Sequence, residues 1–472
     1  MLLLTLFSRL TRSEYHAFLS WLAHRRHRKL KRYRDVCSYL WSDLAKLGEP
    51  FATLDLEQLY ERCFPDRPYK DAHWRRFSHE LRLELETFLL DRKNARDEDR
   101  LIWDRLDLYR KLDLERHYTL TLSKARRAIE ASDKCGAEQL LQAYQLERTA
   151  YRSGLLQTER TGSNNLTDHS ELLDRAILAL RLRQICEQLS AARLQIDKGQ
   201  ALEIQANNLI EQAIKFEDEP AISVYAKAAQ LYTSTRQDEG DRHFDTFQHS
   251  LAENLHRFKA EEQRDLLLIA INHGLRQANA GRREYLPKLF ELYRKGLEEE
   301  ILLEHGRLSI FTFNNAFGAS IHVDRMDWAE DYLFTLQNRL PKGRGEEVVA
   351  LAKARMAYIK KDYDQVLTEL QKADYRDFIH HMTARLTQLK AYLALDYYHL
   401  AESLISGTRQ LLRRHSDRSY HYKNYRNIFT LAARVLKLSP GTDQAREKLI
   451  NRIQQTQPCT EKRWLLEQIE PN

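Results

Sequence analysis

Apolar side chains recur at intervals of three or four residues through most of this 472-residue chain, and this spacing predicts amphipathic α-helices. The first ninety residues contain four such segments. The first follows a capping box at 11–14, in which a hydroxyl and a carboxylate satisfy backbone donors at the helix start. Its apolar face carries Tyr15, Phe18, Leu19 and Leu22. The four segments predict a small helical domain with its own core.

The periodicity and its interruptions predict three parts along the chain. The N-terminal helical domain is expected at residues 1–92, followed by long connecting helices at 93–160. A small, polar stretch without periodicity at 161–165 predicts a linker. Residues 166–472 are expected to form an array of helical repeats.

Repeats are clearest near the C-terminus, where similar segments at 327–333, 362–367 and 397–402 follow one another at intervals of 35 residues. Each segment begins a helix with an aromatic residue and follows another helical segment. Two helices in about 34 residues is the period of tetratricopeptide repeats, which these units resemble. The resemblance implies a stack of helix pairs whose extended concave surface binds a peptide or a partner protein.

The aromatic residues align across the three units. We expect Trp328, Tyr363 and Tyr398 to occupy equivalent positions at the start of the second helix, with their rings largely buried between neighbouring helices. Truncating Tyr363 to alanine would then cost about 3–5 kcal/mol of folding free energy, as deletion of a core aromatic does.

The small positions of the tetratricopeptide pattern align less completely. Ala354 matches the small residue of the first helix, and Ala401 matches the alanine of the second. In the last unit, Leu389 stands in place of the small residue of the first helix. In the other two units, Asp331 and Val366 stand in place of the alanine of the second helix.

The layout of the whole chain is also similar to a group of long helical bacterial proteins of no assigned activity. This resemblance supports the architecture and implies no reaction. The segments that carry it are LFSRLTRSEYHAFLSWL, CFPDRPYKDAHWRRFSHELRLELETFLL, AINHGLRQANAGRREYLPKLFELYRKGLE and TFNNAFGASIHVDRMDWAEDYLFTLQNRLP.

Composition also indicates an all-α fold. The chain has only 15 glycines and 9 prolines, the residues that tight turns and sheet edges need most. Apolar residues make up 43% and charged residues 30% of the chain, as in a folded globular protein. The predicted fold is an all-α, tetratricopeptide-like solenoid of helical hairpins, preceded by a small N-terminal helical domain.

Cysteine usage and hydropathy bear on the cellular compartment. The five cysteines lie far apart without zinc-type spacing, which favours free thiols in a reducing environment. The N-terminal segment lacks the features of a signal peptide, and no window approaches the ~18 uncharged apolar residues of a membrane span. We therefore expect a cytoplasmic protein without a membrane partner.

The net charge of +7 arises from residues 25–34, because the rest of the chain has 68 basic and 68 acidic residues. In one interpretation this segment binds a polyanion such as nucleic acid, with a salt-dependent affinity. In the other it is a helix end and loop, where the helix dipole favours cations. The candidate polyanion-binding residues are Arg25, Arg26, Arg28, Lys29, Lys31, Arg32 and Arg34.

A second basic and aromatic stretch, 413–426, is a candidate partner-binding surface. Its tyrosines and arginines can stack on and grip a peptide or a polyanion. In a repeat array the same tyrosines would instead fill the space between helices. The candidate partner-binding residues are Arg413, Arg414, Tyr420, Tyr422 and Tyr425.

The sequence carries no recognisable catalytic, cofactor or metal signature. It lacks phosphate-binding loops, dinucleotide fingerprints, HExxH and GxSxG motifs. His24 and His27, like His380 and His381, lack the four-residue separation that is usual for metal pairs on a helix. We therefore assign no catalytic residue, no cofactor and no metal. An enzyme whose site is assembled from scattered carboxylates and histidines is an alternative without positive support. Whether two carboxylates form a buried pair is left open.

The preferred interpretation is a non-enzymatic helical-repeat scaffold that binds a protein or peptide partner. The alternative is a nucleic-acid-binding regulator that uses residues 25–34, with the repeat array as its sensor or partner-binding domain. Residues 56–90 faintly resemble the winged helix of activators with tetratricopeptide-like sensor domains. Residues 91–97, however, lack the alternating pattern of a wing strand.

Overall fold

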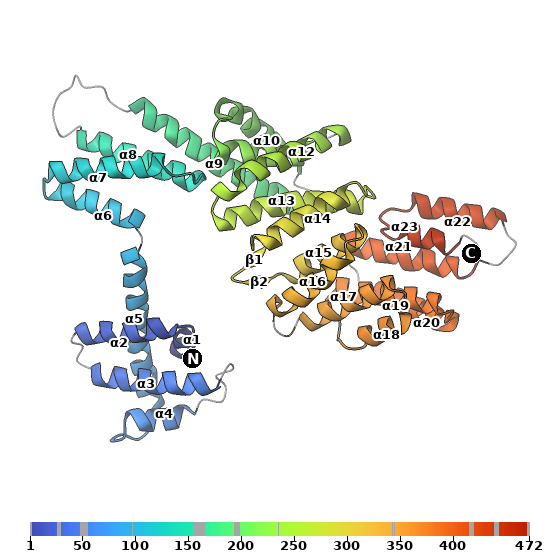
Figure 1. The fold of residues 1–472 in the computed structure, drawn as a ribbon, viewed down its shortest axis with the longest axis horizontal. Helices are drawn as coiled ribbons and strands as arrows, with labels where there is room; N and C mark the ends of the chain where they lie inside the picture. The colour runs from blue at the N-terminus through green and yellow to red at the C-terminus, as the bar shows by residue number, and fades with distance from the viewer. Residues whose placement is uncertain are drawn as a thin grey trace. The chain divides into compact units, whose positions relative to one another are not determined.

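The computed structural model of the protein contains almost only helices. It describes residues 2–25, 30–47, 55–96, 98–154, 166–192, 199–234, 236–341, 343, 345–414, 420–438 and 443–469. These residues form twenty-three α-helices, three 3-10 helices and one two-stranded hairpin (Figure 1). The structure is 82% helical, which confirms the predicted all-α class. Within the described ranges, no helix combines the length and apolarity that crossing a membrane requires.

The chain folds into two compact units. The first comprises residues 1–131 and 149–161, and the second comprises residues 132–148 and 162–472. The sequence-based division into parts at 1–92, 93–160 and 166–472 stays a prediction.

The first five helices of the first unit bury a common core. The predicted capping box is present, since the Glu14 amide donates to Thr11 Oγ1 over 3.2 Å and the Thr11 amide donates to Glu14 Oε2 over 2.9 Å. The sequence did not predict the first helix, whose Leu3, Leu4 and Phe7 are buried in this core. The five helices are α1 (Leu2–Phe7), α2 (Arg12–His24), α3 (Leu30–Leu47), α4 (Leu56–Cys63) and α5 (Asp71–Arg96).

Residues 91–96 continue α5 as a helix, so this stretch does not form the strand that a winged helix would need. Helices α6 (Glu98–Lys111) and α7 (Glu115–Glu130) pack against each other after it. Helix α8 (Ala137–Gly154) begins in the second unit and ends in the first.

The second unit continues with helices that pack against their sequence neighbours, and a short hairpin follows them. The core of this part lies among α9 to α13. The elements are α9 (Leu166–Ala192), α10 (Gly199–Ala213), η3 (Ile214–Phe216), α11 (Pro220–Thr233), α12 (Gln237–Asn254), η4 (Leu255–Arg257), α13 (Ala260–Asn279), α14 (Tyr285–Glu298), β1 (Leu303–Glu304) and β2 (Arg307–Leu308).

Three consecutive helical hairpins, α15–α16, α17–α18 and α19–α20, follow the strands, and three further helices end the chain (Figure 1). The first helices of neighbouring hairpins pack together, α15 on α17 and α17 on α19. The elements are α15 (Ile310–His322), α16 (Met326–Leu336), η5 (Gln337–Arg339), α17 (Gly345–Ile359), α18 (Tyr363–Leu370), α19 (Phe378–Ala394), α20 (Tyr398–Arg414), α21 (Tyr420–Val435), α22 (Asp443–Gln455) and α23 (Lys462–Glu467).

The turn inside each of these hairpins has the same backbone geometry. Asp324, Lys361 and Asp396 adopt the left-handed conformation, with φ angles of 57°, 61° and 57°. The amide after each of them donates to the carbonyl five residues earlier, over 2.8 to 2.9 Å. This is the Schellman arrangement that ends helices, so the three turn residues define one structural register for the hairpins.

This register corrects part of the sequence alignment. Five residues after the turn residue stand Ala329, Val366 and Ala401, all fully buried. The small position of the first hairpin is therefore Ala329, and the alignment that placed Asp331 there was wrong.

The aromatic alignment was also wrong in part. Tyr363 and Tyr398 both lie two residues after their turn, but Trp328 lies four residues after its turn. Trp328 and Tyr363 are half-buried, whereas the Tyr398 side chain is 54% exposed and donates to Asp396 Oδ1 over 2.9 Å. The expectation of a largely buried ring is therefore wrong for Tyr398.

Candidate functional site

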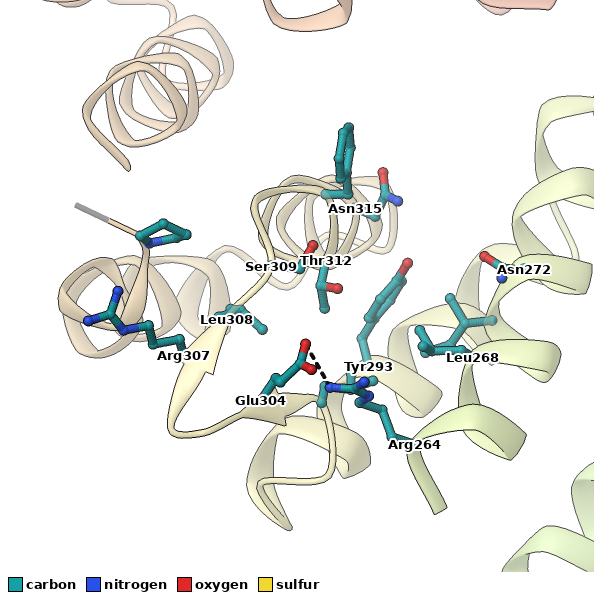
Figure 2. A pocket seen from close by; sticks show the side chains of 14 residues that line it. Arg264, Leu268, Asn272, Tyr293, Glu304, Arg307, Leu308, Ser309, Thr312 and Asn315 are labelled. Carbon is teal, nitrogen blue, oxygen red and sulfur yellow. Dashed lines mark ion pairs between the residues drawn. The ribbon is translucent and has the colours of Figure 1, made fainter. Parts of the chain in front are cut away.

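A hollow of about 500 Å³ opens in the second unit between α13, α14, the β1–β2 hairpin and the start of α15 (Figure 2). Its volume lies within the range of small-molecule and peptide side-chain pockets. Apolar and polar side chains both line it. They are Arg264, Leu268, Ile271, Asn272, Tyr293, Leu302, Glu304, Arg307, Leu308, Ser309, Phe311, Thr312, Asn315 and Pro341.

Two helices supply half of this lining. Arg264, Leu268 and Asn272 stand four residues apart on α13, so they share one face of that helix. Phe311 and Asn315 have the same spacing at the start of α15. The hollow is therefore bounded by two rigid elements.

The β1–β2 hairpin closes one side of the hollow. His305 and Gly306 at its turn have φ angles of 51° and 74°, as the two central residues of a type I′ turn do. The register pairs Glu304 with Arg307. Glu304 Oε2 accepts from Arg264 Nη1 over 3.0 Å, and this ion pair joins the hairpin to α13 (Figure 2).

The floor of the hollow contains Tyr293 of α14, which lies between Leu268 and Thr312 in Figure 2. The Tyr293 ring is buried. Burial raises the pKa of the Tyr293 hydroxyl above its ordinary value, so Tyr293 is neutral and acts as a hydrogen-bonding group.

The hollow favours an acidic group. Arg264 and Arg307 face one carboxylate, Glu304. The first turn of α15 has no acidic residue, and the side chain of its N-cap, Ser309, makes no capping hydrogen bond. The positive end of the α15 dipole therefore adds to the positive charge of the two arginines.

A second hollow, of about 350 Å³, lies next to the first and has the opposite charge. Four carboxylates line it against one lysine and one arginine. Its lining residues are Ile310, Phe311, Gly343, Glu346, Glu347, Lys372, Ala373, Asp374, Arg376, Asp377, Phe378 and His380.

Phe311 lines both hollows and is 58% exposed. Its ring centroid lies 6.3 Å from that of His380. An exposed phenylalanine between a basic and an acidic hollow forms one continuous surface along the edge where α15, α17 and α19 begin. We call this surface, formed by the residues of the two hollows, the Phe311 groove.

His380 and Glu347 are a histidine and a carboxylate in contact, as in many catalytic dyads, but both ring nitrogens of His380 already have partners. Nδ1 lies 3.3 Å from Glu347 Oε1, and Nε2 lies 2.6 Å from Asn314 Nδ2. Because the carboxylate only accepts and the amide nitrogen only donates, the partners fix the tautomer with the proton on Nδ1. The buried pair therefore joins α15, α17 and α19 and leaves no nitrogen to take a substrate proton. In the described parts of the chain, no three His, Cys, Asp or Glu residues converge as metal ligands would.

The structure describes four of the seven candidate polyanion-binding residues. Arg25 lies 3.3 Å from Glu84 Oε2 and 4.5 Å from the centroid of the Trp21 ring. Arg32 lies 5.4 Å from the centroid of Phe64. Two of the cations thus contact residues of their own unit.

Lys31 and Arg34 are exposed on α3. Arg26, Arg28 and Lys29 lie outside the described residues, as does the linker predicted at 161–165. The polyanion-binding assignment stays a prediction.

The second candidate surface is only partly exposed. Arg413 and Arg414 are exposed at the end of α20. The hydroxyl of Tyr420 donates to the Asn279 carbonyl over 3.3 Å, and that of Tyr422 to the Leu412 carbonyl over 2.7 Å.

Tyr425 is buried, and its hydroxyl lies 2.7 Å from Thr383 Oγ1. It fills space between α19 and α21, so it is not available to a partner. The assignment of Tyr425 to a binding surface was wrong, because its ring is needed for packing between helices.

Sequence reasoning missed the Phe311 groove. Phe311 lies in the first turn of a helix, where the sequence does not distinguish it from a residue of the core. The one signal in the sequence was the pair His305–Gly306, which resembles the Asn-Gly pair of a tight hairpin turn and precedes the start of this helix.

Comparisons of the chain with protein-family models, curated proteins and solved structures give no match.

Proposed function

We propose that this protein is a non-enzymatic scaffold that binds a segment of a partner protein in the Phe311 groove. The proposal includes a tetratricopeptide-like arrangement of the hairpins from α15 to α20. The recurrence of one turn geometry at Asp324, Lys361 and Asp396 supports that arrangement. A stack of this kind presents the same end of each first helix along one edge.

The observation that carries the proposal is the continuity of the groove through Phe311. Concave sites lined by apolar and polar groups are where proteins bind ligands, and a few large anchors carry most of the energy of an interface. Because both hollows are formed by helix starts and a tight hairpin, the groove is preformed and its residues lose little entropy on binding.

Charge complementarity specifies the ligand. An acidic residue of the partner matches the hollow with Arg264 and Arg307, and a basic residue matches the hollow with Glu346 and Asp374. The segment bound would place an apolar side chain on Phe311, between these two charges.

Selection of random peptides displayed on phage against the full chain tests the proposal. We expect selected peptides to share an apolar residue flanked by an acidic residue on one side and a basic residue on the other. Phe311→Ala should weaken their binding about tenfold or more, as loss of an interface anchor does. Arg264→Gln should weaken the binding of peptides that carry the acidic residue, and should leave the binding of peptides without it unchanged.

Phe334 provides a matched control, because it is 79% exposed on α16 and lines neither hollow. Phe334→Ala should leave peptide binding unchanged. Peptides that bind the Phe311→Ala variant as tightly as the unaltered chain would contradict the proposal, and so would a selection that enriches no common sequence.

A further inference from the structure

Three buried side-chain oxygen atoms near the start of α8 make no hydrogen bond. They are Glu138 Oε2 and Gln139 Oε1 of α8 and Glu262 Oε2 of α13, and none has a partner in the described chain. The Glu262 side chain is only 2% exposed. Buried polar atoms normally have hydrogen-bond partners, so three unpartnered acceptors in one place indicate a missing donor or cation.

The backbone at Gly136 shows that these oxygens surround a common space. Gly136 has a φ angle of 148°, and a Cβ atom there would lie 2.7 Å from Gln139 Oε1 and 3.0 Å from Glu262 Oε2. Both oxygens are thus within 3.0 Å of one point, which a side chain at residue 136 would occupy. The third side chain reaches the same place through Arg183, whose Nη1 lies 3.7 Å from Glu138 Oε1 and 3.5 Å from Glu262 Oε1.

The charges around this space are mostly negative. Arg183 lies 3.4 to 3.7 Å from four carboxylates and compensates the charge of one. The positive ends of α8 and α13 add about half a charge each. Lys259 also favours the charged form of Glu262, but this lysine is exposed to solvent. An excess of negative charge therefore remains on the four carboxylates, which are Glu138, Glu187, Glu262 and Asp265.

A cation accounts for this arrangement better than the other possible partners do. A water molecule donates only two hydrogen bonds and leaves the charge unchanged. A proton shared between the two carboxylates leaves the Gln139 oxygen without a partner. Exchange of the amide oxygen and nitrogen of Gln139 would give Glu262 a donor, but would leave the excess charge. A cation satisfies all three oxygens and supplies the missing positive charge.

We propose that Glu138, Gln139 and Glu262 bind a hard divalent cation, Ca²⁺ or Mg²⁺. All three ligand atoms are oxygens, from two carboxylates and one amide, and these ions prefer oxygen ligands. Both ions accept water molecules in their remaining coordination positions. Arg183 is a positioning residue, because it holds the other oxygen of each carboxylate. Since one ligand is an amide, the site does not require three acidic, histidine or cysteine ligands to converge.

The cation site does not depend on the Phe311 groove. None of its three ligands lines either hollow. The ion joins the start of α8 to the start of α13, so its role is to stabilise the packing of these helices. Loss of peptide binding would leave the cation site unchanged, and the reverse also holds.

Isothermal titration of the full chain with CaCl₂, and separately with MgCl₂, tests the proposal. The chain is first freed of metal with EDTA, and the ionic strength is kept constant. We expect saturable binding of one ion per chain, and the ion that binds more tightly identifies the cation. Glu262→Gln should weaken binding about tenfold or more, because it removes a charged ligand. It keeps an acceptor for the Tyr225 hydroxyl, and circular dichroism checks that the variant is folded.

Two substitutions of Gln139 separate coordination from general electrostatic attraction. Gln139→Leu removes the ligand oxygen without changing the charge, and it should weaken binding several-fold. Gln139→Glu adds a carboxylate and should tighten binding, because the affinity of such sites rises with the charge of the ligands. If the amide instead donates to Glu262, the cation is not needed and Gln139→Glu does not tighten binding.

The matched control is Glu261→Gln, which removes the same charge at the exposed neighbouring position of α13 and should bind the ion as the unaltered chain does. The ion should also raise the thermal midpoint of the unaltered chain above its value in EDTA, as a ligand of the folded state does. The midpoint of Glu262→Gln should not respond. The proposal is wrong if neither ion binds, if Glu261→Gln weakens binding as much as Glu262→Gln, if Gln139→Leu leaves binding unchanged, or if Gln139→Glu fails to tighten it.

Discussion

Lys361 and Asp396 adopt the same left-handed backbone conformation, with φ angles of 61° and 57°, at equivalent turns of neighbouring hairpins. The following amide in each hairpin donates to the carbonyl five residues earlier, over 2.9 Å from Asp362 and 2.8 Å from Tyr397. Neither turn residue is glycine, although a side chain disfavours this conformation. Each turn therefore holds a residue with a side chain in a conformation that glycine adopts more easily.

We predict that Lys361→Gly raises the free energy of unfolding by about 0.5–1 kcal/mol, because glycine adopts a positive φ without steric cost. Asp396→Gly should act in the same direction. Lys353→Gly, in the exposed middle of α17, is the opposite control and should lower stability by about 1 kcal/mol. Urea denaturation measures all three, and loss of stability in Lys361→Gly would contradict the strain argument.

The exposure of Tyr398 leads to a second prediction. Tyr398→Ala should change the free energy of unfolding by less than about 1 kcal/mol, since surface substitutions rarely do more. Tyr363→Ala should cost more than that but less than the 3–5 kcal/mol or so of a full core aromatic, because its ring is half-buried. Equal costs for the two variants would show that the rings have equivalent surroundings after all.

Helical periodicity was sufficient to predict the all-α class. The capping box at Thr11 and the buried face with Tyr15 and Phe18 follow from local chemistry, and both are present. Helix α1 was missed because a seven-residue apolar start has no periodicity to distinguish it. The register of the hairpins was misjudged by two residues at Trp328, because aromatic identity was a weaker guide than the turn that fixes helix packing.

The binding surfaces were harder to predict because they depend on residues far apart in sequence. The Phe311 groove brings together α13, the hairpin, α15, α17 and α19. Tyr425 shows the converse error, since a tyrosine among basic residues has the composition of a binding surface but packs against Thr383. Local composition does not distinguish an exposed aromatic such as Phe311 from a buried one such as Tyr425, because the neighbouring helix decides which ring is covered.

The basic segment yields a third prediction. We expect no measurable binding to DNA or RNA at physiological salt, because Arg25 contacts Glu84 and Arg32 covers Phe64. Fluorescence anisotropy with labelled oligonucleotides over a range of salt concentrations measures this. If binding is found, replacing Lys31 and Arg34 with glutamine should reduce the log–log salt slope by about two, at roughly 0.9 per phosphate. A slope that does not change would exclude this segment as the cause.

Glu262 is the least exposed carboxylate of the described residues, at 2%, and it provides the last prediction. Tyr225 donates to its Oε1 over 3.2 Å, and Arg183 Nη1 lies 3.5 Å from the same oxygen. Its Oε2 is buried without a hydrogen-bond partner in the described chain. Burial raises the pKa of Glu262, and repulsion from Glu138 adds to this effect, while Arg183 partly offsets it.

The sign of the pH dependence follows from the raised pKa. Between the ordinary carboxyl pKa of about 4.3 and the raised folded value, the folded chain binds more protons than the unfolded chain, so stability is lost as pH rises through this window. Glu262→Gln removes this loss and keeps an acceptor for Tyr225. We expect its thermal midpoint to exceed that of the unaltered chain at pH 8, and the difference to shrink as the pH falls toward 5. Glu261→Gln, exposed at the neighbouring position of α13, controls for the charge at the helix start and should show no such trend. A difference that grows on acidification would mean that Glu262 is stabilised as an anion by Arg183, and that the burial argument is wrong.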